Sequence, residues 1–441
     1  MKIFRVHVLW IVLVFMSLDV VSAQRLLLTN ATIVDPADRT EKKGSIVIEG
    51  NTIQSVEEMV IEEFDGDVID VEGKWIIPGL YDMHVHSYGN MGPNRSIGEF
   101  LMTPMVSRRM LYSGVTGFLD LFSVEDFIFT LRDTQRKDGM EGADIYAAGP
   151  ILTATGGHGT EYGIPTRVVN NPEEVEKEIG ELIAKKPDVI KLVYDNVPGR
   201  MPTVNLETMK AVVQESNKHD IPVVVHIGTW QDIRDVVEAG AHAVTHTPEE
   251  PLPDDIIPLM LEKGAAIIPT LCVQTEFLNL IQDSTLLESP LLTEMTSADL
   301  LKSYKDTSAF APGFKRWLKA QERSREDLLN TIRALGEAGV PILVGTDAGN
   351  VGTFQGYSVH REMQLMVEAG LSPWNALESA TTRAGAFLGL SAGVSEGSVA
   401  NLVVLNQSPL DDIGHTQDIH MVVYRGKVVD RPSMLSVGGG E

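Results

Sequence analysis

The middle of the chain alternates short apolar runs with longer segments that carry a single apolar face. The short runs are bounded by turn-forming residues, as expected for strands that are buried on both faces. The segments between them, such as residues 205–219, repeat apolar residues at helical spacing, and several end at a glycine. The strand candidates, in chain order, are residues 80–86, 117–121, 144–149, 189–193, 222–226, 243–247, 265–271 and 341–347. Eight such strands that alternate with helices predict an α/β fold, a (β/α)8 TIM barrel rather than an open doubly wound sheet.

Shorter β-like runs occur at both ends of the chain. They are separated by turn formers such as Asp35-Pro36, which indicates antiparallel pairing. We expect both sets to form one small β-sandwich domain, with residues 24–79 as its N-terminal part and residues 391–441 as its C-terminal part. The barrel would then occupy residues 80–390, and an irregular helical insertion at about 272–324 would form a lid or a substrate wall on the catalytic face.

Composition and charge narrow the classes of protein to which the chain can belong. The 441 residues are 43% hydrophobic and 22% charged, which is typical of a globular protein. The formal net charge of −25 argues against nucleic-acid binding, because phosphates require a basic face. The single cysteine, Cys272, excludes an intramolecular disulfide framework and is expected to be a buried core residue.

The first residues have the layout of a secretory signal peptide. Lys2 and Arg5 precede an apolar stretch over residues 8–18, and the small residues within 21–23 allow cleavage before residue 24. We therefore expect residues 1–23 to be removed and the protein to be exported, either to the periplasm or out of the cell. The apolar stretch is short for a membrane span, so no stable span is expected after cleavage; a retained anchor is the alternative.

Four histidines and one aspartate stand at the ends of the predicted barrel strands. His84 and His86 close the first strand, and because residues two apart in a strand point to the same side, both enter the mouth of the barrel. His226, His246 and Asp347 end three later strands. Imidazoles and carboxylates that converge in this way can bind a metal ion.

Lys191 lies inside a predicted strand that is buried on both faces. An unpaired ammonium group there would cost several kcal/mol, or the amine would become neutral. A neutral lysine can take up carbon dioxide to form a carbamate, a bidentate anion that suits a bridge between two cations. The alternative is a lysine that reaches solvent or forms an ion pair.

Taken together, these residues resemble the amidohydrolase superfamily. The resemblance rests on the Pro-Gly-Leu-Tyr-Asp-Met-His-Val-His run at residues 78–86, on the lysine and histidines of the middle strands, and on the Gly-Thr-Asp at residues 345–347. Residues 362–390 and 395–405 also look like the last helical segment of that family and its return to the sheet domain. The resemblance covers nearly the whole chain after the signal, and the branch it indicates is the imidazolonepropionase-like, prolidase-like group.

The resemblance implies a metal-dependent hydrolase with two divalent ions, for which zinc fits the ligand types. The implied ligands are His84, His86 and Asp347 for the more buried ion, His226 and His246 for the second, and carbamylated Lys191 as the bridge. A hydroxide shared by the ions would attack the scissile carbonyl, and Asp347 would carry its proton to the leaving amine. A lysine at this strand favours the two-metal hydrolases over the one-metal members of the superfamily.

Two further residues are candidates for substrate contact. His158 stands in a Gly-Gly-His-Gly loop after the third strand, where glycines let the backbone approach a ligand and the ring can donate to a carbonyl or carboxylate group. A similar loop carries a substrate-contacting histidine in the prolidase-like branch. Tyr194, just after Lys191, is the other candidate, although an aromatic side chain there can equally serve in packing.

The sequence departs from the prolidase-like pattern beside two of the candidate ligands. His226 is followed by Ile-Gly-Thr rather than by an aromatic residue or a second histidine, and threonines flank His246. Proline-dipeptide specificity therefore does not follow, and we expect a small N-acyl amino acid or dipeptide as substrate. The alternatives are a lactonase or phosphotriesterase on the same two-metal centre, a one-metal imidazolone hydrolase or deaminase, and a non-catalytic binding protein; a homo-oligomer is left open.

Overall fold

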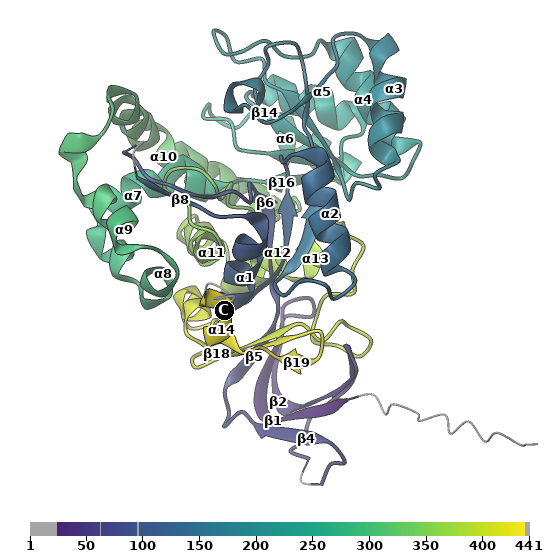
Figure 1. Ribbon diagram of the computed structural model, residues 1–441, viewed down its shortest axis with the longest axis vertical. Coiled ribbons are helices and arrows are strands. Elements are labelled where there is room, and N and C mark those ends of the chain that lie inside the picture. The colour runs from purple at the N-terminus through teal and green to yellow at the C-terminus, as the bar shows by residue number, and fades with distance from the viewer. Residues whose placement is uncertain (1–23, 62, 95–96, 437–441) are drawn as a thin grey trace, which may run out of the picture.

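The computed structural model describes residues 24–61, 63–94 and 97–436. The predicted signal peptide, residues 1–23, lies outside the described residues. The described chain has two parts: a mass of helices around parallel strands, and a curved β-sheet packed beneath it (Figure 1). Among the described residues, no helix combines the length and the hydrophobicity needed to cross a membrane.

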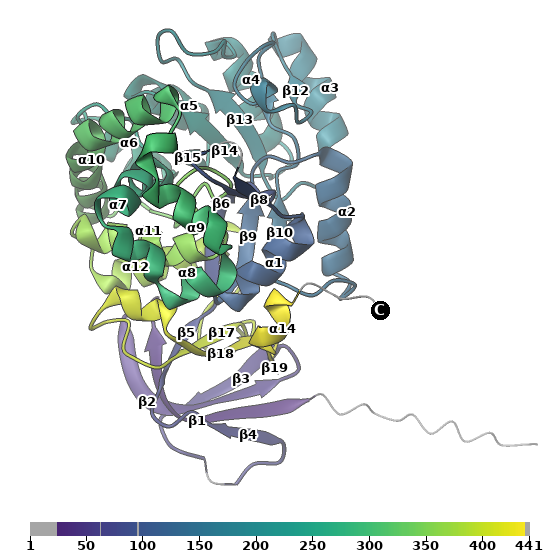
Figure 2. The ribbon, with the colours of Figure 1, turned by 60° about the vertical axis from the view of Figure 1, so that its left-hand side comes forward.

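The lower sheet is built from both ends of the chain, which lie side by side (Figures 1 and 2). Its strands are β1 (Arg25–Asp35), β2 (Thr40–Glu49), β3 (Thr52–Glu57), β4 (Asp67–Asp70), β5 (Trp75–Pro78), β17 (Leu402–Leu405), β18 (Ile419–Tyr424) and β19 (Lys427–Val428). The N-terminal β5 pairs antiparallel with the C-terminal β17, so this pairing joins the two ends. Leu28, Ile46 and Val404 belong to a core cluster of the sheet's own. In the described chain these strands are hydrogen-bonded into one continuous mixed sheet.

The upper strands are parallel and form two arcs. The first arc contains β6 (Leu80–Val85), β9 (Val115–Asp120) and β10 (Asp144–Ala147), with β9 between the other two. The second contains β11 (Leu152–Thr153), β12 (Arg167–Val168), β13 (Ile190–Tyr194), β14 (Val223–Ile227), β15 (Ala243–Thr245) and β16 (Ala266–Ile268). The order of these strands follows the chain from β13 to β16, as the alternation of strands and helices predicts.

The last predicted strand, residues 341–347, is not a regular strand. Its backbone lies between the two arcs: the amide of Leu343 donates to Ile267 of β16, and the amide of Met83 in β6 donates to Val344. The ladder is interrupted because the amide of Thr346 donates to the buried Asp82 carboxylate at 3.0 Å instead of to a neighbouring strand. Isolated bridges at Ile267–Ile342 and Val85–Ala348 are what remains of regular pairing.

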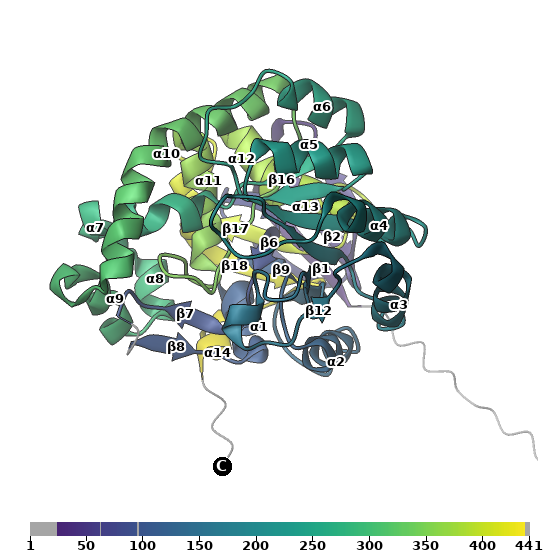
Figure 3. The same ribbon diagram turned by 90° about the horizontal axis from the view of Figure 1, so that it is seen from above.

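Helices lie outside these strands when the molecule is seen from above (Figure 3). They are α1 (Thr103–Tyr112), α2 (Glu125–Gln135), α3 (Pro172–Ile183), α4 (Leu206–Asn217), α5 (Trp230–Ala239), α6 (Ile256–Lys263), α11 (Tyr357–Glu368), α12 (Pro373–Ala380) and α13 (Thr382–Phe387). The helix α5 begins with a capping box between Thr229 and Asp232 and ends at Gly240, whose φ of 98° only glycine adopts without strain. Gly264 and Gly339 end their helices in the same left-handed conformation, which confirms the prediction that several helical segments end at a glycine.

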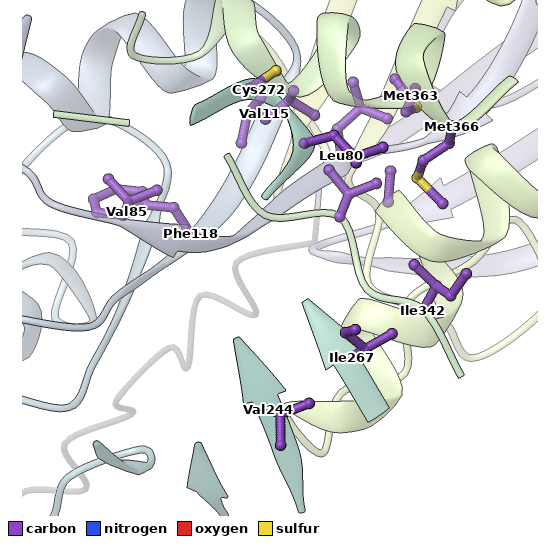
Figure 4. Close-up of a cluster of buried hydrophobic side chains, with 14 of the residues drawn as sticks. Leu80, Val85, Val115, Phe118, Val244, Ile267, Cys272, Ile342, Met363 and Met366 are labelled. Atoms are coloured by element: carbon purple, nitrogen blue, oxygen red, sulfur yellow. The ribbon is translucent and has the colours of Figure 1, made fainter. Parts of the chain in front are cut away.

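Apolar side chains from strands and helices together fill the space between the layers. Figure 4 shows Leu80 and Phe118 from the first arc, Ile267 from the second, and Met363 and Met366 from α11, all of them buried. This packing fixes the strands from which the functional side chains project.

The predicted insertion contains a π-helical turn, several short helices and the first part of a long helix. The turn covers Cys272–Glu276, and it is followed by α7 (Phe277–Gln282), α8 (Pro290–Met295), α9 (Ala298–Lys305) and α10 (Pro312–Ala338). Other small elements include the hairpin β7 (Gly89–Met91) and β8 (Gly98–Phe100) and the C-terminal α14 (Arg431–Leu435). Val273, Gln274 and Trp317 of the insertion line the cavity described below, so this segment contributes a wall of that cavity.

Candidate metal centre and substrate cavity

The carboxyl ends of the parallel strands surround a cavity of about 390 Å³. A site at this end agrees with the general rule that active sites of parallel α/β folds lie at the carboxyl ends of the strands. The cavity gathers the sequence-predicted chemical groups from five strands or strand ends and from the loop that carries His158. They are His84, His86, His158, Lys191, His226, His246 and Asp347.

Three of these residues form a compact group of potential metal ligands. One ligand atom from each of His84, His86 and Asp347 lies within 4.8 Å of the others. Oδ1 of Asp347 lies 2.9 Å from Nε2 of His86 and 3.4 Å from Nε2 of His84, yet this oxygen makes no hydrogen bond. Nitrogen and oxygen lone pairs that converge without hydrogen-bond geometry are the arrangement that a cation requires.

The other two histidines continue this group around the cavity. The ring centroids of His84 and His246 are 5.2 Å apart, and those of His226 and His246 are 4.5 Å apart. Within the described chain, the compact group of histidines and carboxylates does not extend to His226 or His246. The structure therefore brings all six predicted ligands to one cavity and holds three of them at ligand spacing.

Two threonines orient the histidine rings. Nδ1 of His84 lies 2.6 Å from Oγ1 of Thr245, and Nδ1 of His246 lies 2.8 Å from Oγ1 of Thr270, both in hydrogen bonds. Each bond engages Nδ1 and leaves Nε2 of the ring for the cavity. Metal-binding histidines are usually fixed through their second ring nitrogen in this way.

Backbone strain is concentrated at the same strand ends. His246, Thr270 and Asp347 have φ angles of 77°, 53° and 57°, in the left-handed region that residues with a Cβ rarely adopt. Each such residue costs of order 1–3 kcal/mol, and such strain is typical of functional sites. The strained conformation at Asp347 is stabilised by the neighbouring Thr346, whose Oγ1 donates a hydrogen bond to the buried carboxyl group of Asp82 at 2.6 Å.

Burial favours the neutral form of His84, His226 and His246. Removal from water lowers the pKa of His84 and of His246 well below 6.5, and the neighbouring cationic group of Lys191 lowers both further. The pKa of His226 falls to about 4, mainly through burial. Neutral imidazole is the form that binds a metal ion.

Lys191 is 3% exposed, and its Nζ has no hydrogen-bond partner. Burial lowers the pKa of its ammonium group from 10.5 to about 7, and the charge of Asp347 opposes this only in part. The alternatives of a solvent-reaching or ion-paired lysine do not fit this environment. With a pKa of about 7, part of the Lys191 population is unprotonated near neutral pH and has the nucleophilic lone pair that carbamate formation needs.

His158 lines the cavity and is held from behind by Glu161. Its Nδ1 lies 2.7 Å from Oε1 of Glu161, and the other carboxylate oxygen accepts the amide of Gly159 at 2.6 Å. The ring centroid of His158 is 4.7 Å from that of His226. The bond to Glu161 engages Nδ1 of His158 and leaves Nε2 of this cavity-lining ring available.

The prediction that Tyr194 contacts substrate is wrong. Its side chain is buried away from the cavity, and its hydroxyl donates to Oδ2 of Asp235 on α5 at 2.9 Å. The cause is strand alternation: Lys191 and Val193 face the cavity, so residue 194 points to the helix side.

Asp195 and Arg200, on the loop after β13, also belong to the site, although they were not among the residues predicted from the sequence. Arg200 lines the cavity, and its Nη1 donates to Oδ2 of Asp195 at 3.0 Å. The same oxygen of Asp195 lies 3.7 Å from Nε2 of His226. The available signal was a charged pair in a loop that leaves the carboxyl end of a barrel strand, where functional residues gather.

A comparison with family models matches residues 75–429 to the Amidohydrolase family. The match spans most of the chain, from β5 of the lower sheet through the parallel strands to β19. The resemblance drawn from the strand-end motifs is therefore confirmed.

Comparisons with individual proteins agree with this match. An uncharacterised protein of Mycobacterium tuberculosis is 24% identical over 371 residues, which cover 81% of this chain and 85% of that protein. Ochratoxinase of Aspergillus niger is 24% identical over 391 residues, covering 79% of this chain and 74% of that enzyme. Among solved structures, a Xaa-Pro dipeptidase with methionine bound in its active site has a TM-score of 0.76 at 23% identity, and the match covers 92% of this chain and 100% of that one.

Proposed function

Because the chain belongs to the amidohydrolase family, whose members are hydrolases that act on carbon–nitrogen bonds, we propose that it cleaves an amide or peptide-like bond of a small substrate with the help of divalent metal ions. The substrate class is an N-acyl amino acid or a dipeptide. The observation that carries this proposal is the convergence of four histidines, one aspartate and one unpartnered buried lysine on a single cavity.

The residues present fit the metal centre that the family implies. His84, His86 and Asp347 supply a ready group of three ligands, and the orphaned Nζ of Lys191 stands beside neutral histidines that need no deprotonation. A carbamate on Lys191 would convert this amine into an anion able to bridge toward His226 and His246. Histidine and carboxylate donors suit zinc, although manganese, cobalt or iron also accept them.

Divalent ions, when bound, supply Lewis-acid chemistry by lowering the pKa of water and polarising a carbonyl group. The protein's own residues then have separate tasks. The carboxylate of Asp347 accepts the proton of the attacking water and returns it to the nitrogen of the leaving amine. His158, braced by Glu161, presents Nε2 to the substrate's carbonyl or carboxylate oxygens. Trp317 of the insertion adds apolar surface to the cavity wall.

The architecture and location expected from the sequence belong to the same proposal. The two arcs close into a (β/α)8 barrel through residues 341–348, whose backbone hydrogen-bonds to both β6 and β16, and through the amide of Asp188, just before β13, which donates to Ala147 of β10. The chain is exported by way of residues 1–23, which lie outside the described part. A partner beyond a small-molecule substrate is not required by the site.

The test is the metal content of protein purified in the presence of bicarbonate, compared between wild type, Lys191→Ala and a control, Lys137→Ala, in which an exposed lysine is removed. We expect about two ions per chain in wild type and in the control, and a clear loss in Lys191→Ala. One ion or none in wild type, with Lys191→Ala unchanged, would refute the two-ion centre. A panel of matched amide, lactone and phosphotriester substrates then distinguishes the proposed activity from the other hydrolases that the same centre could support.

A further inference from the structure

The loop after β13 places a single arginine at the mouth of the cavity, and we propose that Arg200 binds a carboxylate of the substrate. This inference rests on the proposed function, since it assigns the substrate's charged group to a residue of the same site. It restricts the favoured substrates to amides that carry a free carboxylate close to the scissile bond, and makes neutral amides poor substrates.

Arg200 is the one cationic side chain available to a ligand among the residues described around the cavity. The other cationic group in that lining, Lys191, is buried at the floor and lies among the predicted metal ligands. The side chain of Arg200 is 53% exposed, so it is accessible from the open side. Glu249 also lines the cavity, and the whole chain carries a net charge of −25, so an anionic substrate is repelled unless a cation receives it.

The guanidinium group is held at one edge and open at the other. Its Nη1 donates to Oδ2 of Asp195 at 3.0 Å, and Nη2 and Nε have no hydrogen-bond acceptor among the described residues. A planar guanidinium with two free donors on one side matches the two oxygens of a carboxylate. The ion pair with Asp195 therefore orients Arg200 without using up its capacity to bind an anion.

The anchor of Arg200 is itself fixed to the scaffold. Oδ1 of Asp195 accepts a hydrogen bond from the backbone amide of Val197 at 3.0 Å. The backbone amide of Asp195 donates to Oγ1 of Thr203 at 3.1 Å. The adjacent Asn196 donates from Nδ2 to Asp232, the aspartate of the capping box of α5, at 2.6 Å. The loop is thus bound to both β13 and the start of α5, and a preorganised arginine loses little entropy when a ligand binds.

The absence of a side chain at Gly228 leaves room for the ion pair of Asp195 and Arg200. A Cβ atom built on Gly228, which follows the strand end of β14, would lie 2.1 Å from Oδ1 of Asp195. Any other residue at position 228 would therefore displace the aspartate that holds Arg200. This clash explains the glycine in the Ile-Gly-Thr run after His226, a run that departs from the prolidase-like pattern.

The position of the pair relates the bound carboxylate to the reacting bond. Oδ2 of Asp195, which holds Arg200, is also 3.7 Å from Nε2 of His226, and the ring of His226 packs against that of His158. A carboxylate bound to Arg200 therefore lies on the side of the cavity occupied by His226 and His246, the predicted ligands of the second ion. The aromatic side chains of Phe122, Tyr162 and Trp317 line the same cavity and offer apolar surface to the rest of the substrate.

The experiment compares two probes on metal-loaded protein: N-acetyl-L-phenylalanine, which carries a carboxylate, and its carboxamide, which does not. Binding is measured by calorimetry, and hydrolysis of the acetyl amide bond is followed separately. The variants are Arg200→Met, Arg200→Lys and the control Arg323→Met, which removes an exposed arginine of α10. Metal content is measured for each variant.

We expect wild type to bind the carboxylate probe about 10- to 100-fold more tightly than the carboxamide, as one charge-assisted bidentate contact allows. Arg200→Met is expected to abolish this preference, mainly through KM where hydrolysis is observed, with unchanged metal content; Arg200→Lys retains part of it. Equal binding of both probes to wild type, or an undiminished preference in Arg200→Met, would overturn the inference. Carboxylate-selective binding without hydrolysis of the amide would instead count against the proposed function and leave the role of Arg200 standing.

Discussion

Replacement of Lys191 by methionine tests, without metal ions, whether burial of the ammonium group of Lys191 destabilises the folded chain. Methionine keeps the aliphatic length of the side chain and removes the buried amine. In the metal-free chain, burial lowers the pKa of Lys191 from 10.5 to about 7. At about 1.4 kcal/mol for each pKa unit, this difference corresponds to a cost of order 5 kcal/mol for holding the ammonium group in the folded chain.

The pH dependence of this cost has a definite sign. Below pH 7 the folded and unfolded chains both hold the proton, and the folded chain bears the full cost. Between pH 7 and 10.5 the unfolded chain binds more protons than the folded one, so the free energy of unfolding of wild type rises with pH and the cost fades. Lys191→Met is therefore expected to be more stable than wild type at pH 6.5, with the difference shrinking toward pH 10 by about 1.4 kcal/mol per pH unit.

The assay is urea unfolding of both proteins, with a chelator present and carbon dioxide excluded, at several values between pH 6.5 and 9.5. Lys137→Met serves as the control because it makes the same replacement at an exposed position outside the site. A difference between Lys191→Met and wild type that is constant across this range would refute the reasoning. It would mean that the amine of Lys191 finds a partner or solvent in the folded chain.

Two further substitutions test how the site is supported. Thr245→Val removes the hydroxyl that hydrogen-bonds Nδ1 of His84 at 2.6 Å. It should lower the free energy of unfolding in urea by about 1–2 kcal/mol and weaken the retention of metal ions. An unchanged metal content would contradict the role of Thr245 in orienting the ring of His84. Gly228→Ala introduces a Cβ only 2.1 Å from a buried carboxylate oxygen and should lower stability by about 1–3 kcal/mol. The matched control is Gly180→Ala in α3, where nothing lies within 4 Å of the added Cβ and helix propensity favours alanine; equal thermal shifts in the two variants would argue against the clash.

The strand-end residues of the site could be predicted because their position follows from chain pattern alone. Runs of apolar residues that end in His226 or His246 place those rings at the carboxyl edge of a parallel arrangement, whatever the details of the strand. Lys191 stood out because a charged residue inside such a run conflicts with burial. These features depend on local sequence, and the described structure brings all of them to one cavity.

Other features depend on contacts between segments that are distant in sequence. The interruption of residues 341–347 results from the buried carboxylate of Asp82, far away in the chain, which takes the amide of Thr346. The hydrogen bonds of Thr245 and Thr270 to histidine rings cannot be read from their neighbours in sequence. For Tyr194, alternation from Lys191 already assigned the side chain to the helix side, and that signal was available but not applied.

The lower sheet needs strands from both ends of the chain, and these strands are synthesised at different times. During synthesis β5 leaves the ribosome early, but its antiparallel partner β17 follows only after every parallel strand and helix has been made. Until then one edge of the N-terminal strands stays unpaired, and an unpaired edge invites wrong pairing with other chains. Completion of this sheet is thus a late event in the life of the nascent chain, and any premature stop before residue 402 leaves that edge permanently without its partner.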